Sequence, residues 1–178
     1  AELAARSAGH PTRILDLGTG TGTLGRSMVA RWPGVRVTGV DASSGMLRIA
    51  EATADATLAA GARSRFDTAT AFLDDLPFAS SSIDVAVASF VLQLVPSRAR
   101  ALREIARVIR PGGWFAHVTW RRGGPAYPPD AIADDVFRAA GLDGRDEDPG
   151  RTGDVASAQV AAAELRRAGF RRVRAEEA

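Results

Sequence analysis

The chain has 178 residues, of which 46% are hydrophobic and 25% are charged, as expected for one globular domain with its own core. No apolar run approaches the roughly 20 residues of a membrane-spanning helix, and residues 1–10 lack the apolar segment of a secretory signal. Cysteine is absent, which excludes disulfides and a cysteine nucleophile from this sequence. We expect a cytoplasmic protein that does not engage a membrane.

The charge of the chain argues against two classes of partner. All 23 basic residues are arginine, yet the net charge is only +2, so we expect no nucleic-acid partner. The acidic run Asp146, Glu147 and Asp148 lies in a turn-rich stretch without the spacing of metal ligands. We therefore expect no metal site.

The first 120 residues alternate between predicted strands and predicted helices. Segments rich in apolar and β-branched residues predict strands over 13–17, 35–40, 65–71, 83–91 and 114–120. Helical spacing of apolar residues predicts helices over 23–32, 43–60 and 97–109. Ser43 or Ser44 is placed to cap the second helix and Ser97 the third, which Pro111-Gly112-Gly113 closes. This order predicts an α/β fold, a doubly wound and mostly parallel sheet with helices on both faces.

The last third of the chain is less regular. Turn-forming residues dominate 121–154, with one predicted helix over 131–140. A further helix is predicted over 155–168, with Gly169 as its left-handed cap, and a strand over 170–175. We interpret residues 1–178 as one domain, in which 13–120 form the ligand-binding core and 121–178 form a substrate-side and C-terminal part.

A glycine-rich loop follows the first predicted strand. Gly18, Gly20 and Gly22 alternate there, so the backbone can turn tightly and approach a ligand closely. The N-terminus of the next helix presents N–H groups and a positive dipole end behind the loop. Asp16, two positions before the first glycine, suits a ligand with an ammonium group better than a diphosphate. Asp41, at the end of the second strand, is placed to accept hydrogen bonds from ribose hydroxyls, so the pattern predicts a site for an adenosine-type ligand.

A nicotinamide dinucleotide site is the alternative that this loop leaves open. Gly20, Gly22 and Gly25 form a GxGxxG pattern, but it starts two residues too late after the strand. The same pattern anchored at Gly18 has Thr23 at its third position. We therefore favour the adenosine-type ligand without a diphosphate.

Five motifs in this order resemble the class I S-adenosylmethionine-dependent methyltransferases, in particular the branch that acts on quinones and other small molecules. The motifs are ILDLGTGTG, GVDASSGML, DDLPF, SSIDVAVASFVLQLVP and LREIARVIRPGGWF, and they span residues 13–120. The resemblance implies a Rossmann-like methyltransferase fold, S-adenosyl-L-methionine as cofactor and methyl transfer to a small molecule. The family sheet ends with a further strand, so we expect this chain to lack its final strand and to be a fragment of a longer protein.

The resemblance also implies roles for individual residues. It places Asp16, Gly18, Thr19, Gly20 and Gly22 at the methionine end of the cofactor, Asp41 at the ribose, Ala42 and Met46 along the adenosine, and Ser89 and Phe90 beside the sulfonium and amino group.

One position departs from the family pattern. Phe72, followed by Leu73, stands where relatives carry an acidic contact to the adenine amino group. Either Phe72 stacks on the adenine while the Leu73 backbone hydrogen-bonds to it, or a local insertion lets Asp74 serve. In a third interpretation, Phe72 is simply part of the core.

Few residues are candidates for the chemistry itself. Methyl transfer from a sulfonium is an in-line displacement, in which positioning is most of the protein's contribution. His117, on the fifth strand, is a candidate base, although a histidine hydrogen-bonded in or near the core is the competing interpretation. Gln93 stands where relatives often carry histidine and could orient a hydroxyl or a water, but it cannot act as a base. Trp120 would either line the acceptor pocket or cover the sheet.

Two other functions stay open at this point. One is a nucleic-acid methyltransferase, against which the near-neutral charge argues. The other is a non-catalytic domain that binds the cofactor or acts through protein contacts. The sequence predicts neither the acceptor, nor the atom methylated, nor the oligomeric state.

Overall fold

The computed structural model describes residues 12–122, 128–141 and 153–177. Its strands are β1 (Thr12–Leu17), β2 (Val35–Asp41), β3 (Phe66–Thr70), β4 (Ile83–Ser89) and β5 (Ile109–Val118). Its helices are α1 (Thr23–Arg31), α2 (Ser44–Thr57), α3 (Ala60–Arg63), α4 (Arg98–Val108), α5 (Pro128–Ala139) and α6 (Ala158–Arg167). In this part of the chain, no helix is long and apolar enough to cross a membrane.

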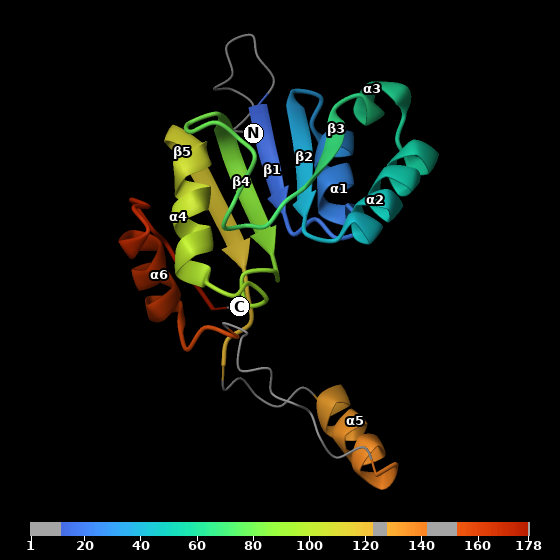
Figure 1. Cartoon of the computed structure of the whole chain (residues 1–178), viewed down its shortest axis with the longest axis vertical. Helices are drawn as coiled ribbons and strands as arrows, with labels where there is room; N and C mark the ends of the chain where they lie inside the picture. Colours follow the sequence, from blue (N-terminus) through green and yellow to red (C-terminus); the bar gives the residue numbers. More distant parts are fainter. Residues whose placement is uncertain (1–11, 123–127, 142–152, 178) are drawn as a thin grey trace.

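The five strands form one parallel sheet in the order β3-β2-β1-β4-β5, so the predicted α/β architecture is confirmed (Figure 1). The chain builds the sheet outward from β1 to β3 and then returns to place β4 on the other side of β1. The strand order therefore reverses between β1 and β4. In open α/β sheets, ligands bind at such a switch point, beyond the carboxyl ends of the strands.

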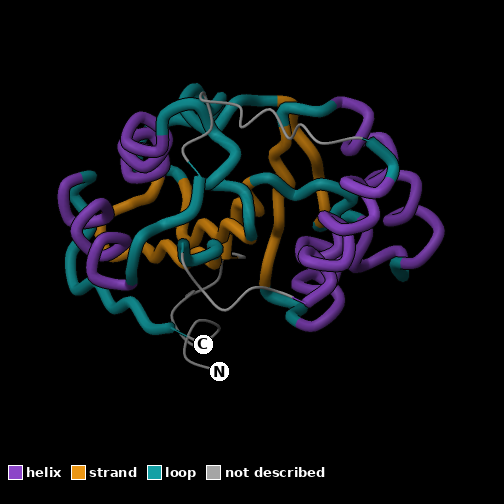
Figure 2. The backbone as a smooth tube through the Cα atoms, turned by 90° about the horizontal axis from the view of Figure 1, so that it is seen from below, coloured by secondary structure: helices purple, strands orange, loops and turns teal. Residues whose placement is uncertain are grey.

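Alternate residues of the central strands supply two separate cores, one on each face of the sheet. Ile14 and Val85 pack in a cluster with residues of α1 and α2, around the fully buried Phe66. Their neighbours Leu15 and Ala86 point the other way, into a cluster with α4 and α6. Figure 2 shows helices on both sides of the strands. Burial on both faces explains the continuous apolar character of β1 and β4.

Serine side chains cap three helices. The hydroxyl of Ser43 accepts from Met46 N at 3.3 Å, so Ser43 and not Ser44 caps α2. The hydroxyl of Ser97 accepts from Arg100 N at 3.4 Å, as predicted. Ser157 caps α6 in the same way, which starts that helix later than the sequence pattern predicts.

Several predicted boundaries were wrong for local backbone reasons. The helix expected over 43–60 ends at Thr57 because Leu58 is extended, and α3 is a separate turn. β4 ends at Ser89, two residues early, because Phe90 takes a left-handed φ of 52°. β5 begins at Ile109 and includes the Pro-Gly-Gly run, with a shift in its register against β4. The buried face of α1 is a separate matter from these boundaries. Met28 is buried, but Leu24 and Trp32 are exposed, because the helix turns Gly25 and Val29 toward the sheet.

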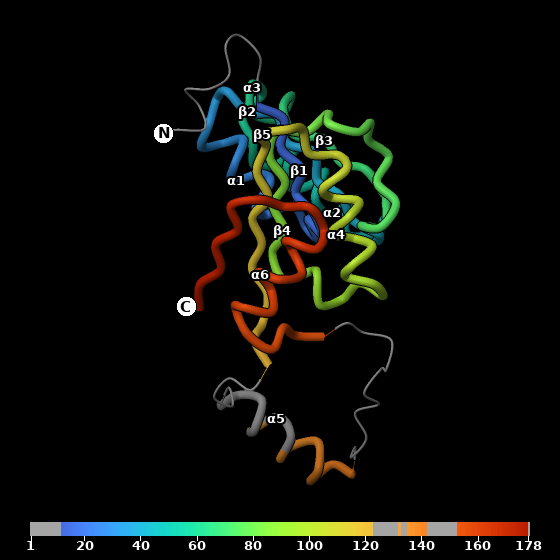
Figure 3. The backbone as a smooth tube through the Cα atoms, turned by 90° about the vertical axis from the view of Figure 1, so that its left-hand side faces the viewer, coloured from blue at the N-terminus to red at the C-terminus, as the bar shows by residue number. Residues whose placement is uncertain are grey.

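The C-terminal part differs most from expectation. Residues 170–175 form no strand, because Phe170 packs its ring on Phe115 of β5 and Arg172 has a left-handed φ of 54°. Gly169, with φ of 101°, follows α6 as expected. In the described ranges no strand comes after β5, in keeping with the expected absence of a final strand. Figure 3 shows α6 beside the sheet and α5 away from it.

Candidate cofactor and methyl-transfer site

The glycine loop lies directly beyond the carboxyl end of β1. Gly18 has a φ of 66°, and a Cβ on it would lie 2.3 Å from Cγ2 of Val91, in the loop after β4. Gly20 also has a positive φ, of 55°, but a Cβ there would meet no atom of the described residues within 4 Å. Gly18 thus permits close packing within the protein, whereas Gly20 leaves open space above the backbone, where a ligand can approach.

The Asp16 side chain hydrogen-bonds to the glycine loop and to the start of α1. Its side chain is only 2% exposed, and its Oδ2 accepts from Thr19 Oγ1 at 2.7 Å and from Gly25 N at 3.0 Å. Burial raises the pKa of Asp16, against the two hydrogen bonds that lower it, and the nearby charge of Asp41 raises it further. The N–H of Gly25, one of those expected to be free at the start of α1, is therefore occupied by Asp16. A cation beside this carboxylate would offset the cost of its burial.

Asp41 joins the glycine loop to the start of α2. Its Oδ2 accepts from Gly20 N at 2.9 Å and its Oδ1 accepts from Ser43 N at 2.8 Å. Thr19 N donates to Val40 O at 2.9 Å, so the loop is also tied to the end of β2. A half-buried carboxylate fixed by two backbone N–H groups is pre-organised to accept from a pair of hydroxyl groups.

The residues after Asp41 form the adjoining surface. Ala42 is exposed, and Met46 in the first turn of α2 is 44% exposed. A shallow hollow of about 800 Å³ runs along α2 past Ser43 and Met46, but it does not include the glycine loop. The hollow therefore lies to one side of the predicted adenosine position.

The region that departs from the family pattern follows β3. Phe72 is 66% exposed, so its interpretation as a core residue was wrong. Its carbonyl accepts from Asp75 N at 3.1 Å, whereas the Leu73 side chain is buried in the core. Asp74 lies 3.4 Å from a guanidinium nitrogen of Arg100, so its carboxylate already has a cationic partner. The geometry favours Phe72 as a stacking surface over Asp74 as an adenine contact.

The loop after β4 begins at the two residues that the resemblance places beside the sulfonium and amino group of the cofactor. Ser89 is exposed and Phe90 is 39% exposed, and Phe90 N donates to Val118 O at 2.9 Å. The ring of Phe90 lies 4.5 Å, centroid to centroid, from that of Trp120, which is 59% exposed. These two rings and β5 border a groove of about 2720 Å³ that extends to the C-terminal segment. A left-handed φ at a non-glycine residue such as Phe90 is typical of functional sites.

The amide of Gln93 joins Phe90 to Thr119, the residue before Trp120. Its Nε2 donates to Phe90 O at 2.9 Å, and its Oε1 accepts from Thr119 Oγ1 at 3.2 Å. Both ends of the amide are thus used within the protein, and the side chain is buried. Gln93 positions its neighbours and is not turned toward an open acceptor site.

His117 lies on the face of β5 that packs toward α6. Its ring stacks on Phe115 at 5.5 Å, and its buried Nδ1 has no hydrogen-bond partner among the described residues, contrary at this nitrogen to the interpretation of a hydrogen-bonded core histidine. Burial lowers the pKa of His117, as does the charge of Arg98, while Glu164 raises it. The lowered pKa favours the neutral imidazole, and His117 stays a candidate base whose Nδ1 has no orienting hydrogen bond from the described residues.

The structure also brings in residues that the sequence did not single out. Arg98 is 8% exposed and joins the loop after β4 to α6, and Val91 packs on Gly18. Nothing in the sequence separates Arg98 from the other 22 arginines. The acidic run 146–148 lies outside the described residues, and within the described ones no group of three or more histidine, aspartate or glutamate side chains could hold a metal.

Fold and site together define a class. A parallel sheet with a glycine loop after β1, an acidic residue after β2 and a switch point beside both is the Rossmann-like arrangement of the S-adenosylmethionine-dependent methyltransferases. The sequence profile of the methyltransferase domain family matches residues 14–113, more than half of the chain. The chain therefore belongs to the methyltransferase domain family, and its cofactor is S-adenosyl-L-methionine.

Individual relatives support this assignment. The chain is 39% identical over 112 residues to the ubiquinone/menaquinone biosynthesis C-methyltransferase UbiE of Syntrophotalea carbinolica, across 63% of this chain and 44% of that protein. It is 34% identical over 139 residues to the malonyl-[acyl-carrier protein] O-methyltransferase of Laribacter hongkongensis, across 75% of this chain and 43% of that protein. The chain thus spans less than half the length of these two curated relatives.

The fold recurs in solved structures with different chemistry. The [4+2]-cyclase SpnF is similar with a TM-score of 0.68 and 25% identity, across 94% of this chain and 55% of that one. The fold alone therefore does not name the reaction, which must be argued from the site.

Proposed function

We propose that this chain transfers the methyl group of S-adenosylmethionine to a small-molecule acceptor. The observation that carries the proposal is the pairing of Asp41 with the open backbone at Gly20, directly beside the switch point between β1 and β4. Within this proposal, residues 13–120 bind the cofactor and residues 121–178 lie on the acceptor side. A cytoplasmic location belongs to the same proposal, in keeping with a sequence that has no cysteine.

The residues of the loop would divide the cofactor between them. The methionine end would lie over Gly18, Thr19, Gly20 and Gly22, with the Asp16 carboxylate beneath the loop attracting the ammonium group. Asp41 would accept from the two ribose hydroxyls, while Ala42, Met46, Phe72 and the Leu73 backbone would border the adenosine. The bound cofactor supplies an electrophilic methyl group on a sulfonium.

Ser89 and Phe90 would border the sulfonium and the amino group, and the acceptor would lie on the opposite side of the methyl group. Phe90 and Trp120 offer it an apolar wall at the carboxyl ends of β4 and β5. Positioning the acceptor in line with the methyl group would supply most of the rate, since no strong base faces this wall in the described residues. Small molecules are favoured because the relatives' names include a quinone-pathway enzyme, and the near-neutral charge disfavours nucleic acids.

Calorimetric titration with S-adenosylmethionine tests the proposal. The wild type should bind with micromolar affinity, and Asp41→Ala should bind about 100-fold more weakly, because charge-assisted hydrogen bonds contribute about 1.5–3 kcal/mol each. Asp67→Ala on β3 is the matched control, since Asp67 is an exposed carboxylate paired with Arg36. Equal binding by wild type and Asp41→Ala would reject Asp41 as the ribose contact.

A further inference from the structure

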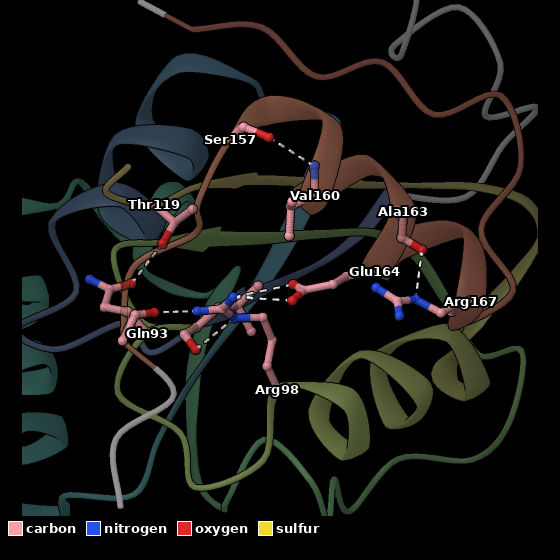
Figure 4. Close-up of polar contacts among 10 residues, drawn as sticks. Gln93, Arg98, Thr119, Ser157, Val160, Ala163, Glu164 and Arg167 are labelled. Carbon is pink, nitrogen blue, oxygen red and sulfur yellow. Dashed lines mark hydrogen bonds and ion pairs between the residues drawn. The ribbon is translucent and has the colours of Figure 1, made fainter. Parts of the chain in front are cut away.

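A buried arginine ties together three segments beside the proposed methyl-transfer site. Arg98 is the first residue of α4, and its guanidinium NH1 lies 3.2 Å from Oε2 of Glu164 on α6. Its Nε donates to Leu92 O at 3.4 Å, and its NH2 donates to Gly153 O. One side chain thus joins the loop after β4, the segment before α6, and α6 itself (Figure 4).

Stability alone is a weak explanation for this arrangement. The Arg98 side chain is 9% exposed and that of Glu164 is 28% exposed, so the guanidinium loses most of its contact with water. Replacing such a pair with apolar residues often leaves stability unchanged or improves it, whereas a planar guanidinium can fix several acceptors in one geometry. The contacts of Arg98 fit a role in fixing the geometry of its three partners.

Three backbone carbonyls of the loop 90–93 accept hydrogen bonds that fix the loop. Phe90 O accepts from the Gln93 amide, Leu92 O from Arg98, and Gln93 O from Gly153 N at 3.1 Å. Between these anchors, Val91 presses on Gly18 so closely that a Cβ on the glycine would lie 2.3 Å from it. A shift of the loop would therefore change the space above the glycine loop.

We propose that the Arg98–Glu164 pair positions the loop 90–93 over Gly18. It thereby shapes the part of the site that binds the methionine end of the cofactor. Gly153 and Glu164 lie beyond the residues 14–113 that match the family, so the C-terminal segment completes the donor site from outside the matched core. The inference rests on the proposed function, because it takes Gly18 to face the methionine end.

Two ligands separate positioning from general support of the fold. S-adenosylmethionine reaches the whole site, whereas 5′-methylthioadenosine has the adenosine and the sulfur but lacks the amino-acid part. Arg98→Lys keeps the charge but cannot satisfy the three partners at once. Glu164→Gln keeps the size of the side chain and removes the charge at α6. Arg167→Gln is the control, since Arg167 bonds only the carbonyl of Ala163 on its own helix among the contacts described.

The expected result is a loss confined to the larger ligand. By calorimetry, Arg98→Lys should bind S-adenosylmethionine about tenfold more weakly, and Glu164→Gln about threefold. Both variants should bind 5′-methylthioadenosine within about twofold of the wild type, and Arg167→Gln should match the wild type for both ligands. Glu164→Gln carries the test if Arg98→Lys does not fold.

Other outcomes would overturn the inference in distinguishable ways. Unchanged affinity of the folded variants for S-adenosylmethionine, or equal losses for both ligands, would reject the positioning role and leave the proposed function standing. A folded wild type that binds neither ligand would reject the proposed function, and the inference with it.

Discussion

The glycine loop after β1 and the loop after β4 are held in place by different means. The glycine loop and the start of α1 are fixed by the backbone N–H groups of Gly20 and Gly25, which donate to Asp41 and Asp16 over at most 21 residues of chain. The loop 90–93, which lies between the proposed cofactor and acceptor positions, depends on side chains far away in sequence. Arg98 reaches Glu164 over 66 residues and Gln93 reaches Thr119 over 26.

Under the proposed function, this contrast would let one fold keep a cofactor and vary an acceptor. Backbone-directed contacts restrict a few positions to glycine and aspartate and leave the remaining side chains free. Long-range side-chain contacts depend on which residues the C-terminal segment supplies, so a different segment could rebuild the groove beside β5.

The largest effect should come from the two glycines that look alike in the sequence. Gly18→Ala forces a Cβ against Val91 in a left-handed conformation, which should lower the free energy of unfolding by about 2–5 kcal/mol. Gly20→Ala meets no atom of the described ranges within 4 Å and should cost only about 1–2 kcal/mol of backbone strain, while its methyl group enters the cofactor space. Denaturant unfolding of both variants measures the loss of stability, and calorimetric titration measures the loss of affinity for S-adenosylmethionine.

If the two variants lost stability equally, the packing of Val91 on Gly18 would be wrong. If Gly20→Ala bound S-adenosylmethionine as the wild type does, the open space above Gly20 would not belong to the cofactor.

Asp16→Asn should have an intermediate effect that depends on pH. The asparagine can keep the hydrogen bonds from Thr19 and Gly25, but it loses the charge, so S-adenosylmethionine should bind about tenfold more weakly at pH 7. Burial raises the pKa of Asp16, so the carboxylate of the wild type should lose its charge as pH falls through the raised pKa. The tighter binding of the wild type should therefore fade over this pH range, whereas the affinity of Asp16→Asn should not depend on this titration.

The pH dependence of the free energy of unfolding should have the opposite sign to that of cofactor binding. The native state of the ligand-free wild type takes up a proton on Asp16 more readily than the unfolded chain does, because the native pKa is raised. The wild type should therefore gain stability relative to Asp16→Asn as pH falls through the raised pKa toward the ordinary value. Urea unfolding of both proteins across this range measures the sign, and a parallel pH dependence would contradict it.

The smallest effect on the cofactor should come from the aromatic wall. Trp120 is 59% exposed and contacts the ring of Phe90, so Trp120→Leu should lower the free energy of unfolding by only about 1 kcal/mol. Affinity for S-adenosylmethionine should change by less than about twofold, while KM for any acceptor found by screening should rise. A large loss of cofactor affinity would move Trp120 to the donor side.

The local geometry of the glycine loop and of the end of β2 can be predicted from the sequence, because local rules decide it. Glycines at positive φ, a serine cap and an acidic residue at a strand end leave signatures within a few residues. The sequence does not predict the partner of Arg98 or the roles of Gln93 and His117, because those depend on where α6 packs. The mistaken strand over 170–175 has the same origin, since Phe170 is directed by its contact with Phe115.

Hydrogen exchange with and without S-adenosylhomocysteine tests the division between the two sides most directly. At saturating ligand, amides of the loop 18–25, of residues 41–46 and of the loop 89–93 should gain protection, because the cofactor contacts or closes on them. Amides of β5 and α6 should exchange as in the free protein. Protection confined to β5 and α6, or none at saturation, would contradict a cofactor site built on the glycine loop and Asp41.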